Sequence, residues 1–92
     1  MKDFATIEQA IEDFSKAIEI KPNLSQAYFN RAVVYSQIGN FEAAVNDLSK
    51  YIELNPNDAN GYYNRGIIYQ KIFEGSKAKL DFVKAKELGY KG

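Results

Sequence analysis

The chain repeats itself every 34 residues, and this period constrains its fold more than any other feature. A fixed period of this length is typical of proteins in which one supersecondary unit stacks on the next. Positions that recur three times are Ala10/Ala44/Ala78, Asp13/Asp47/Asp81, Lys16/Lys50/Lys84, Glu19/Glu53/Glu87, Phe14/Leu48/Phe82 and Ile20/Leu54/Leu88. Positions that recur twice are Tyr28/Tyr62, Asn30/Asn64, Arg31/Arg65, Tyr35/Tyr69 and Pro22/Pro56. We therefore expect a stack of similar units.

Each unit is predicted to be a pair of helices. Tyr28, Ala32 and Tyr35 share one stripe of a helix, and the pattern stops at Gly39-Asn40, where Asn40 is a plausible N-cap. The inner face of the second helix carries Ala44, Val45, Leu48, Tyr51 and Ile52, and it ends at Asn55-Pro56-Asn57 because proline lacks a backbone donor. The predicted fold is all-α, with helices near 7–21, 24–38, 41–54, 58–72 and 76–88.

At 92 residues the chain is one domain at most. We expect a half unit over 1–24, which matches only the second half of a repeat, followed by full units over 25–58 and 59–92. The sequences Thr6-x-x-Gln9 and Asn23-x-x-Gln26 are possible capping boxes for the first two helices.

Period, helix pair and residue positions together resemble the tetratricopeptide repeat, whose pattern is W-x2-L-G-x2-Y, then A-x3-F, then P. The middle unit matches with Tyr28, Arg31-Ala32, Tyr35, Ala44-x3-Leu48 and Pro56; the last with Tyr62, Arg65-Gly66, Tyr69 and Ala78-x3-Phe82; the half unit with Ala10-x3-Phe14 and Pro22. The resemblance implies antiparallel helical hairpins stacked as a right-handed α-solenoid, with about five helices in 2.5 repeats, and a scaffold that binds proteins or peptides.

The sequence departs from the family pattern in three places. Arginine occupies the Leu position twice, and Gly75 stands where the middle unit has Phe41. The missing aromatic predicts looser packing at the last turn. The last unit has no proline stop, and a polar capping helix, which such arrays usually need, does not follow it.

Composition excludes several kinds of chemistry. Without Cys or His the chain cannot form a disulfide, a thiolate nucleophile, a Cys/His metal site or an imidazole catalyst. No phosphate loop or nucleophile motif is present, so we expect neither catalytic residues nor a cofactor. Twelve basic and twelve acidic residues balance, which argues against nucleic-acid and membrane partners. The N-terminal residues lack the apolar run of a signal peptide, so the chain as given is expected to be soluble, while its compartment stays open.

The candidate partner-binding groove is the face of the first helix of each full unit that lies outside the inner stripe. It comprises Gln26, Phe29, Asn30, Val33, Ser36, Gln37, Asn60, Tyr63, Asn64, Ile67, Gln70 and Lys71. The resemblance implies that these positions line a concave groove, in which Asn30 and Asn64 bind the backbone of an extended peptide. A carboxamide suits this because it offers both a donor and an acceptor. The alternative is that these amides are solvated surface residues.

One subclass of the family clamps a C-terminal carboxylate with a cluster of Lys, Arg and Asn. Here only Lys71 is a clear cation in the groove, so we do not carry that clamp over to this chain. Arg31 and Arg65 must find acceptors or reach water, and our hypothesis is that they pair with the repeating aspartates within or between hairpins.

The alternative function is self-association. Apolar residues near the two ends of the array are expected to lack cover: Phe4, Ile7, Ile11 and Phe14 at one end, and Leu80, Val83 and Tyr90 at the other. Such ends can produce a homo-oligomer by end-to-end stacking or by hairpin exchange.

Overall fold

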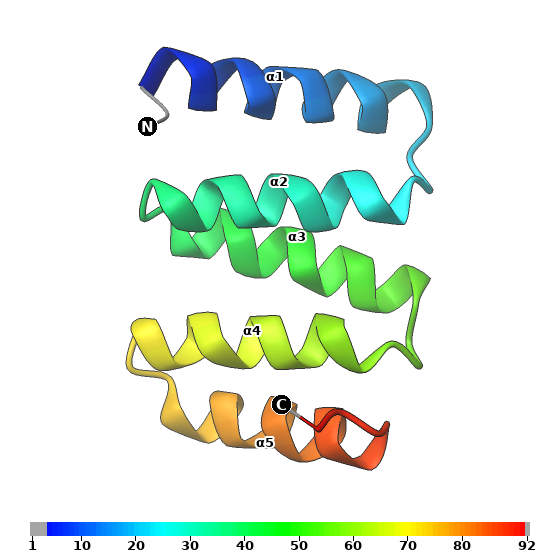
Figure 1. The fold of residues 1–92 in the computed structure, drawn as a ribbon, viewed down its shortest axis with the longest axis vertical. Coiled ribbons are helices and arrows are strands. Elements are labelled where there is room, and N and C mark those ends of the chain that lie inside the picture. The colour runs from blue at the N-terminus through cyan, green and yellow to red at the C-terminus, as the bar shows by residue number, and fades with distance from the viewer. Residues whose placement is uncertain (1–3, 92) are drawn as a thin grey trace.

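The computed structural model describes residues 4–91, and the fold over this range is all-α. Its helices are α1 (Phe4–Ile20), α2 (Ser25–Gln37), α3 (Phe41–Leu54), α4 (Ala59–Lys71) and α5 (Gly75–Glu87). Figure 1 shows the helices following one another along the long axis, with α1 at one end and α5 at the other. Each helix packs against the next one in the chain. The helices form where the sequence predicted them, and the largest difference is that α1 begins at Phe4 instead of residue 7.

Both predicted capping boxes are wrong. Thr6 lies inside α1, because that helix begins earlier than expected. The N-cap of α2 is Leu24, whose side chain cannot accept a hydrogen bond. The turn after α1 is closed by a backbone bond of 3.1 Å from the amide of Leu24 to the carbonyl of Lys21. This turn places the N-cap one residue beyond Asn23.

The N-caps of α3 and α4 use side chains. The Asn40 carboxamide accepts a hydrogen bond from the amide of Ala43 at 3.3 Å, which confirms the predicted cap. Asp58 caps α4 by accepting from the amide of Asn60 at 2.9 Å. Each such bond satisfies a backbone donor that has no partner within the helix.

The core lies between α2, α3 and α4 and is built around small residues. Ala32, Ala44, Leu48 and Ile68 are all nearly inaccessible to solvent. In the next hairpin Gly66 faces Phe82, and a Cβ added at Gly66 would lie 2.7 Å from the phenyl ring. The small residues therefore allow close helix contacts.

Two arginine bridges hold the array together, where an arginine bridge means one guanidinium bound by side chains from two other helices. Arg31 of α2 donates to both carboxylate oxygens of Asp47 in α3, at 2.8 and 2.7 Å, and to the hydroxyl of Ser15 in α1 at 3.0 Å. Asp47 is only 4% exposed, so the carboxylate is desolvated as well as paired. Its hydrogen bond raises the pKa of Arg31 above the usual value.

The second bridge repeats the first, 34 residues later. Arg65 of α4 donates twice to Asp81 of α5, at 2.8 Å each, and to Ser49 of α3 at 3.1 Å. Each guanidinium also lies between two tyrosine rings of its own helix; for Arg31 these are Tyr28 and Tyr35, at 5.9 and 5.8 Å. The predicted Arg–Asp pairing is confirmed, and it occurs within each hairpin.

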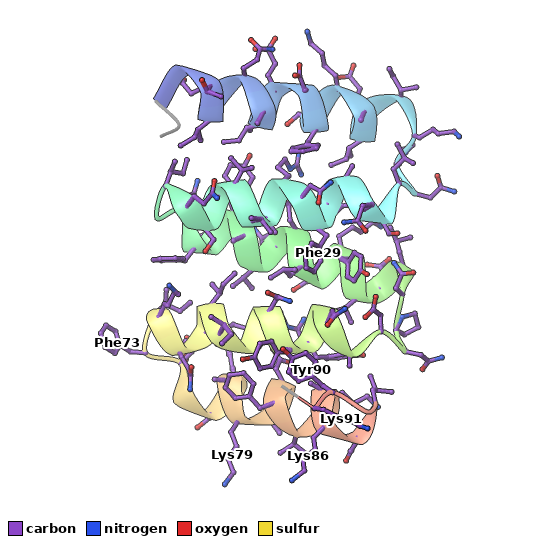
Figure 2. All side chains as sticks on the ribbon, viewed as in Figure 1. Phe29, Phe73, Lys79, Lys86, Tyr90 and Lys91 are labelled. Carbon is purple, nitrogen blue, oxygen red and sulfur yellow. The ribbon has the colours of Figure 1, made fainter. Side chains whose placement is uncertain are left out.

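Phe73 occupies the left-handed backbone conformation at the turn between α4 and α5, with φ = 63°. The equivalent residue between α2 and α3 is Gly39, with φ = 79°. Left-handed geometry strains a residue with a Cβ but not a glycine. The phenyl ring gains no packing in return, because Phe73 is 94% exposed and projects beyond the turn, as Figure 2 shows.

Phe73→Gly should therefore raise the free energy of unfolding by about 0.5 to 1 kcal/mol, after the greater freedom of glycine in the unfolded chain is subtracted. Urea denaturation followed by circular dichroism measures this change. Phe73→Ala is the matched control, because it removes the same ring and keeps the strained Cβ. An equal gain in both variants would show that the backbone conformation is not the cause.

The outer face of α5 is polar where the corresponding face of α3 is apolar. Lys79 and Lys86 take the positions of Val45 and Ile52, and Figure 2 shows both lysines pointing away from the array. At the last turn, nothing lies within 4 Å of a Cβ added at Gly75, consistent with the looser packing predicted there. These two lysines make one face of α5 polar, while Leu80 and Val83 of the same helix stay exposed.

Candidate functional site

A hollow of about 320 Å³ lies between α2, α3 and α4. Its floor is formed by the core residues Ala32, Leu48 and Ile68. Apolar walls come from Phe29, Val33 and Ile67, and a polar rim from Ser36, Gln37, Asn64 and Lys71. An apolar interior with a few polar groups at the edge is the usual composition of a binding site for an organic ligand or a side chain.

The structure brings together about half of the residues proposed for the groove. Those that line the hollow are Phe29, Val33, Ser36, Gln37, Asn64, Ile67 and Lys71. Those that do not line it are Gln26, Asn30, Asn60, Tyr63 and Gln70. Gln70 instead lines a second hollow beside α5, with Gly75, Ala78, Lys79, Phe82, Val83 and Lys86. The hollow is thus centred where the C-terminal half of α2 meets α4.

The two groove asparagines are bonded in different ways. The Asn30 carboxamide oxygen accepts from Gln26 at 3.1 Å. The amide group of Asn64 donates to the carbonyl of Asn60, one turn earlier in α4, at 2.8 Å. Asn64 therefore keeps its oxygen available as an acceptor at the rim of the hollow, whereas Asn30 keeps its amide hydrogens.

Lys71 is held at one end of the hollow by an aromatic ring. Its Nζ lies 5.9 Å from the centre of the Phe41 ring in α3, within the range of a cation–π interaction. Lys71 belongs to the last turn of α4 and Phe41 is the first residue of α3, so the contact joins these two helices. A negatively charged group bound there would find a positioned cation.

The sequence did not point to the floor of this site. The helical pattern places Ala32 and Leu48 on the inner faces of their helices, and it does not distinguish Ile68. All three are core residues whose inner ends contact other helices while one edge faces the hollow. The signal for Ile68 was its place directly after Ile67 in a helix that must bury one side.

Tyr63, the repeat equivalent of Phe29, is covered by the C-terminal segment. The ring of Tyr90 stacks on that of Tyr63 with centroids 4.0 Å apart and planes 18° from parallel. Phe29 instead contacts Tyr51 of α3 edge to face at 5.0 Å, and the position equivalent to Tyr51 is Ala85. The amide of Tyr90 donates to the Ala85 carbonyl at 3.0 Å. Tyr90 therefore provides for Tyr63 the aromatic contact that Tyr51 provides for Phe29.

Tyr51 links the two hairpins through its hydroxyl group as well as its ring. The hydroxyl donates to the carboxylate of Asp58, the N-cap of α4. Burial and this hydrogen bond raise the pKa of Tyr51 to about 12. The ring also faces Gly61, where an added Cβ would lie 3.0 Å from Tyr51 and 2.9 Å from Ile52. The Tyr51 ring, against which Phe29 packs, is therefore held by the hydroxyl bond to Asp58 and by its contact with Gly61.

Residues 4–91 show neither of two other kinds of site. The described helices include none that is long and apolar enough to span a bilayer. Within the same range, no three acidic side chains gather where they could share a metal ion.

Successive helical hairpins with an apolar hollow on one face define the class of α-helical repeat proteins. The sequence profile described as "TPR repeat" matches residues 6–39 and 34–72. The chain belongs to the tetratricopeptide repeat family, as its sequence pattern indicated. A search of curated proteins gives no match.

Several solved structures share the fold. The second TPR of Spaghetti (RPAP3), bound to the HSP90 peptide SRMEEVD, superposes with a TM-score of 0.84 at 26% identity, covering 90% of this chain and 77% of that one. The first TPR of the same protein, bound to the same peptide, gives 0.86 at 25% identity, covering 92% and 68%. MamA gives 0.87 at 26% identity over 91% of this chain, which spans only 49% of the MamA chain.

Proposed function

We propose that this chain is a protein-binding scaffold and that the hollow between α2, α3 and α4 holds an apolar side chain of an extended peptide. The observation that carries the proposal is the apolar floor of Ala32, Leu48 and Ile68 beneath a rim with a free carboxamide oxygen on Asn64. A volume of about 320 Å³ is at the lower end of the range for small-ligand sites, which suits one or two side chains of a longer ligand.

The rim determines how the rest of the peptide is held. The oxygen of Asn64 can accept a hydrogen bond from a peptide N–H without reading the adjacent side chain. Asn30, at the equivalent position of α2, can donate to a carbonyl. A single lysine at one end suits one carboxylate of the ligand, so we favour a peptide with one acidic group near its apolar residue. Two TPR modules of RPAP3, which are similar to this chain, are bound to a short peptide.

The proposed role is non-enzymatic and needs no cofactor. We assign 25–58 and 59–92 as the full repeats and 1–24 as a half repeat, so that the hollow lies at the junction of the two full repeats. A groove of this length contacts few ligand residues. Single-site affinity should therefore be modest.

A peptide-display screen against the full chain tests the proposal. Binders should share an apolar residue, and Val33→Asp should weaken them about tenfold or more, because it places a charge beside the apolar wall. Val33 is 43% exposed, so the variant should still fold. Asn64→Ala should also weaken binding, and Gln70→Ala, on the same helix but outside the hollow, is the control. Undiminished binding to both groove variants would refute the site.

The alternative function is self-association through the ends of the array. Leu80 and Val83 of α5 are 71% and 49% exposed, which favours it. Ile7, Ile11 and Phe14 are half-buried, Tyr90 stacks on Tyr63, and the side chain of Phe4 lies outside the described residues. Light scattering from micromolar to millimolar concentration separates the two functions: a strict monomer that binds peptide excludes self-association.

A further inference from the structure

Tyr51 departs from the pattern that the repeats share. The equivalent positions in α1 and α5 hold the small residues Ala17 and Ala85. Opposite Tyr51 lies Gly61, whose equivalent in α2 is Ala27. A Cβ added at Gly61 would lie 3.0 Å from the Tyr51 ring, and Tyr51 is only 7% exposed. The large residue on α3 is therefore matched by the smallest residue on α4, at the junction that the hollow occupies.

The ring of Tyr51 reaches the apolar wall of the hollow. It meets the ring of Phe29 edge to face, with centroids 5.0 Å apart and planes at 63°. Phe29 lines the hollow, whereas Tyr51 does not. Edge-to-face contacts between aromatic rings favour a defined orientation. Tyr51 therefore lies behind this wall and limits how the Phe29 ring can turn.

The hydroxyl group of Tyr51 is connected to the polar rim by a chain of hydrogen bonds. It donates to Oδ2 of Asp58, and Oδ1 of the same carboxylate accepts from the amide of Asn60 at 2.9 Å. The carbonyl of Asn60 accepts from the carboxamide of Asn64 at 2.8 Å. This last bond holds the nitrogen of Asn64, so that its oxygen stays available at the rim of the hollow.

Both ends of this connection are fixed by the fold. A buried phenol needs a hydrogen-bond partner, and Asp58 provides it for Tyr51. Asp58 is also the N-cap of α4, so its position is tied to the start of that helix. One buried side chain on α3 thus contacts a residue of α2 on one side of the hollow and the first turn of α4 on the other.

We propose that Tyr51 is a positioning residue that determines which apolar side chain the hollow accepts. Its ring fixes the orientation of Phe29, and its hydroxyl, acting through Asp58 and the first turn of α4, fixes Asn64. Tyr51 acts through these residues without touching the ligand. The inference rests on the proposed peptide groove, whose specificity it explains.

Tyr51→Phe tests the hydrogen-bond chain, because it removes the hydroxyl and keeps the ring. In the ¹⁵N-labelled full chain without ligand, the side-chain amide signal of Asn64 should move more than that of Asn30, its repeat equivalent. The probes for binding are the peptides selected by display against the full chain. Tyr51→Phe should weaken their binding about threefold or more, since a hydrogen bond that orients the rim is lost.

Tyr62→Phe is the matched control for the hydroxyl. Tyr62 also lies on α4, and its hydroxyl donates to the carbonyl of Pro56 at 3.1 Å, outside the chain that leads to Asn64. It should leave the Asn64 signal and the affinity unchanged. An Asn64 signal that Tyr51→Phe does not move, or an equal loss of affinity in the two variants, would overturn the proposal.

A second variant tests the ring. Tyr51→Ala combined with Gly61→Ala restores the residues found one repeat earlier, Ala17 and Ala27. The double variant should melt at a higher temperature than Tyr51→Ala alone, because alanine fills part of the space and favours the helix. Without the Tyr51 ring, Phe29 is free to turn and the hollow widens.

Each selected peptide is therefore also made with leucine or phenylalanine at its apolar position. In the double variant the ratio of phenylalanine affinity to leucine affinity should rise about threefold or more. A folded double variant with an unchanged ratio would mean that Tyr51 only stabilises the fold, which contradicts the proposal. If display yields no peptide, the proposed function fails, and the Asn64 signal of the free protein still tests the role of Tyr51.

Discussion

Asp47→Ala should lower the free energy of unfolding by about 3 kcal/mol, because it leaves the partly buried guanidinium of Arg31 without its carboxylate. Asp47 is 4% exposed, and both of its oxygens accept from Arg31, at 2.7 and 2.8 Å. A loss of this size is a large part of the stability of a small domain. Urea denaturation followed by circular dichroism measures it.

A double-mutant cycle with Arg31→Ala separates the pair from the loss of packing. The coupling energy should exceed the roughly 0.2 to 1 kcal/mol that an exposed pair contributes. Lys16 and Glu12, which are 66% and 57% exposed, form a matched surface pair in the same chain. A coupling at Arg31–Asp47 no larger than that of Lys16–Glu12 would show that the bridge does not stabilise the fold.

Leu48→Ala should lower the free energy of unfolding by about 3 kcal/mol, within the range for a leucine that leaves a cavity in a packed core. Leu48 is 2% exposed and lies between the helices of both hairpins. Because it also forms part of the floor, the substitution should deepen the hollow and shift the preference of the groove towards larger apolar side chains.

Leu80→Ala is the control for this prediction, since it makes the same chemical change at a residue that is 71% exposed. It should alter stability by no more than about 0.5 kcal/mol. Similar losses in the two variants would mean that Leu48 is not buried as described. An unchanged ligand preference in Leu48→Ala would separate the floor from the binding site.

The sequence predicted the helices from local spacing, and it predicted the pairing of arginine with aspartate because both residue types recur with the 34-residue period. A period of 34 residues places Arg31 and Arg65 in equivalent environments, so the pairing inferred for one arginine applied to the other as well. The capping boxes failed because a short motif competes with the geometry of the turn, which placed Leu24 at the N-cap of α2.

The extent of the hollow could not be predicted from one helix face. The predicted groove is the side of α2 and α4 that lies outside the inner stripe, a prediction that treats both helices alike. The second copy differs because Tyr90 folds back onto Tyr63, a contact made by a residue outside any helix. Likewise, the floor of the hollow depends on how three helices pack together, and the periodicity of one helix does not predict that arrangement.

Because each arginine bridge spans three helices, it affects the cooperativity with which the array unfolds. In a linear repeat protein each unit contacts only its neighbours, and units can melt one at a time when the coupling between them is weak. The hydroxyls of Ser15 and Ser49 tie each hairpin to the helix before it. At the next position of the series stands Val83, which has no hydroxyl to offer. The two serines thus couple the unfolding of neighbouring hairpins from α1 to α5. A helix packed after α5 would lack the corresponding hydrogen bond.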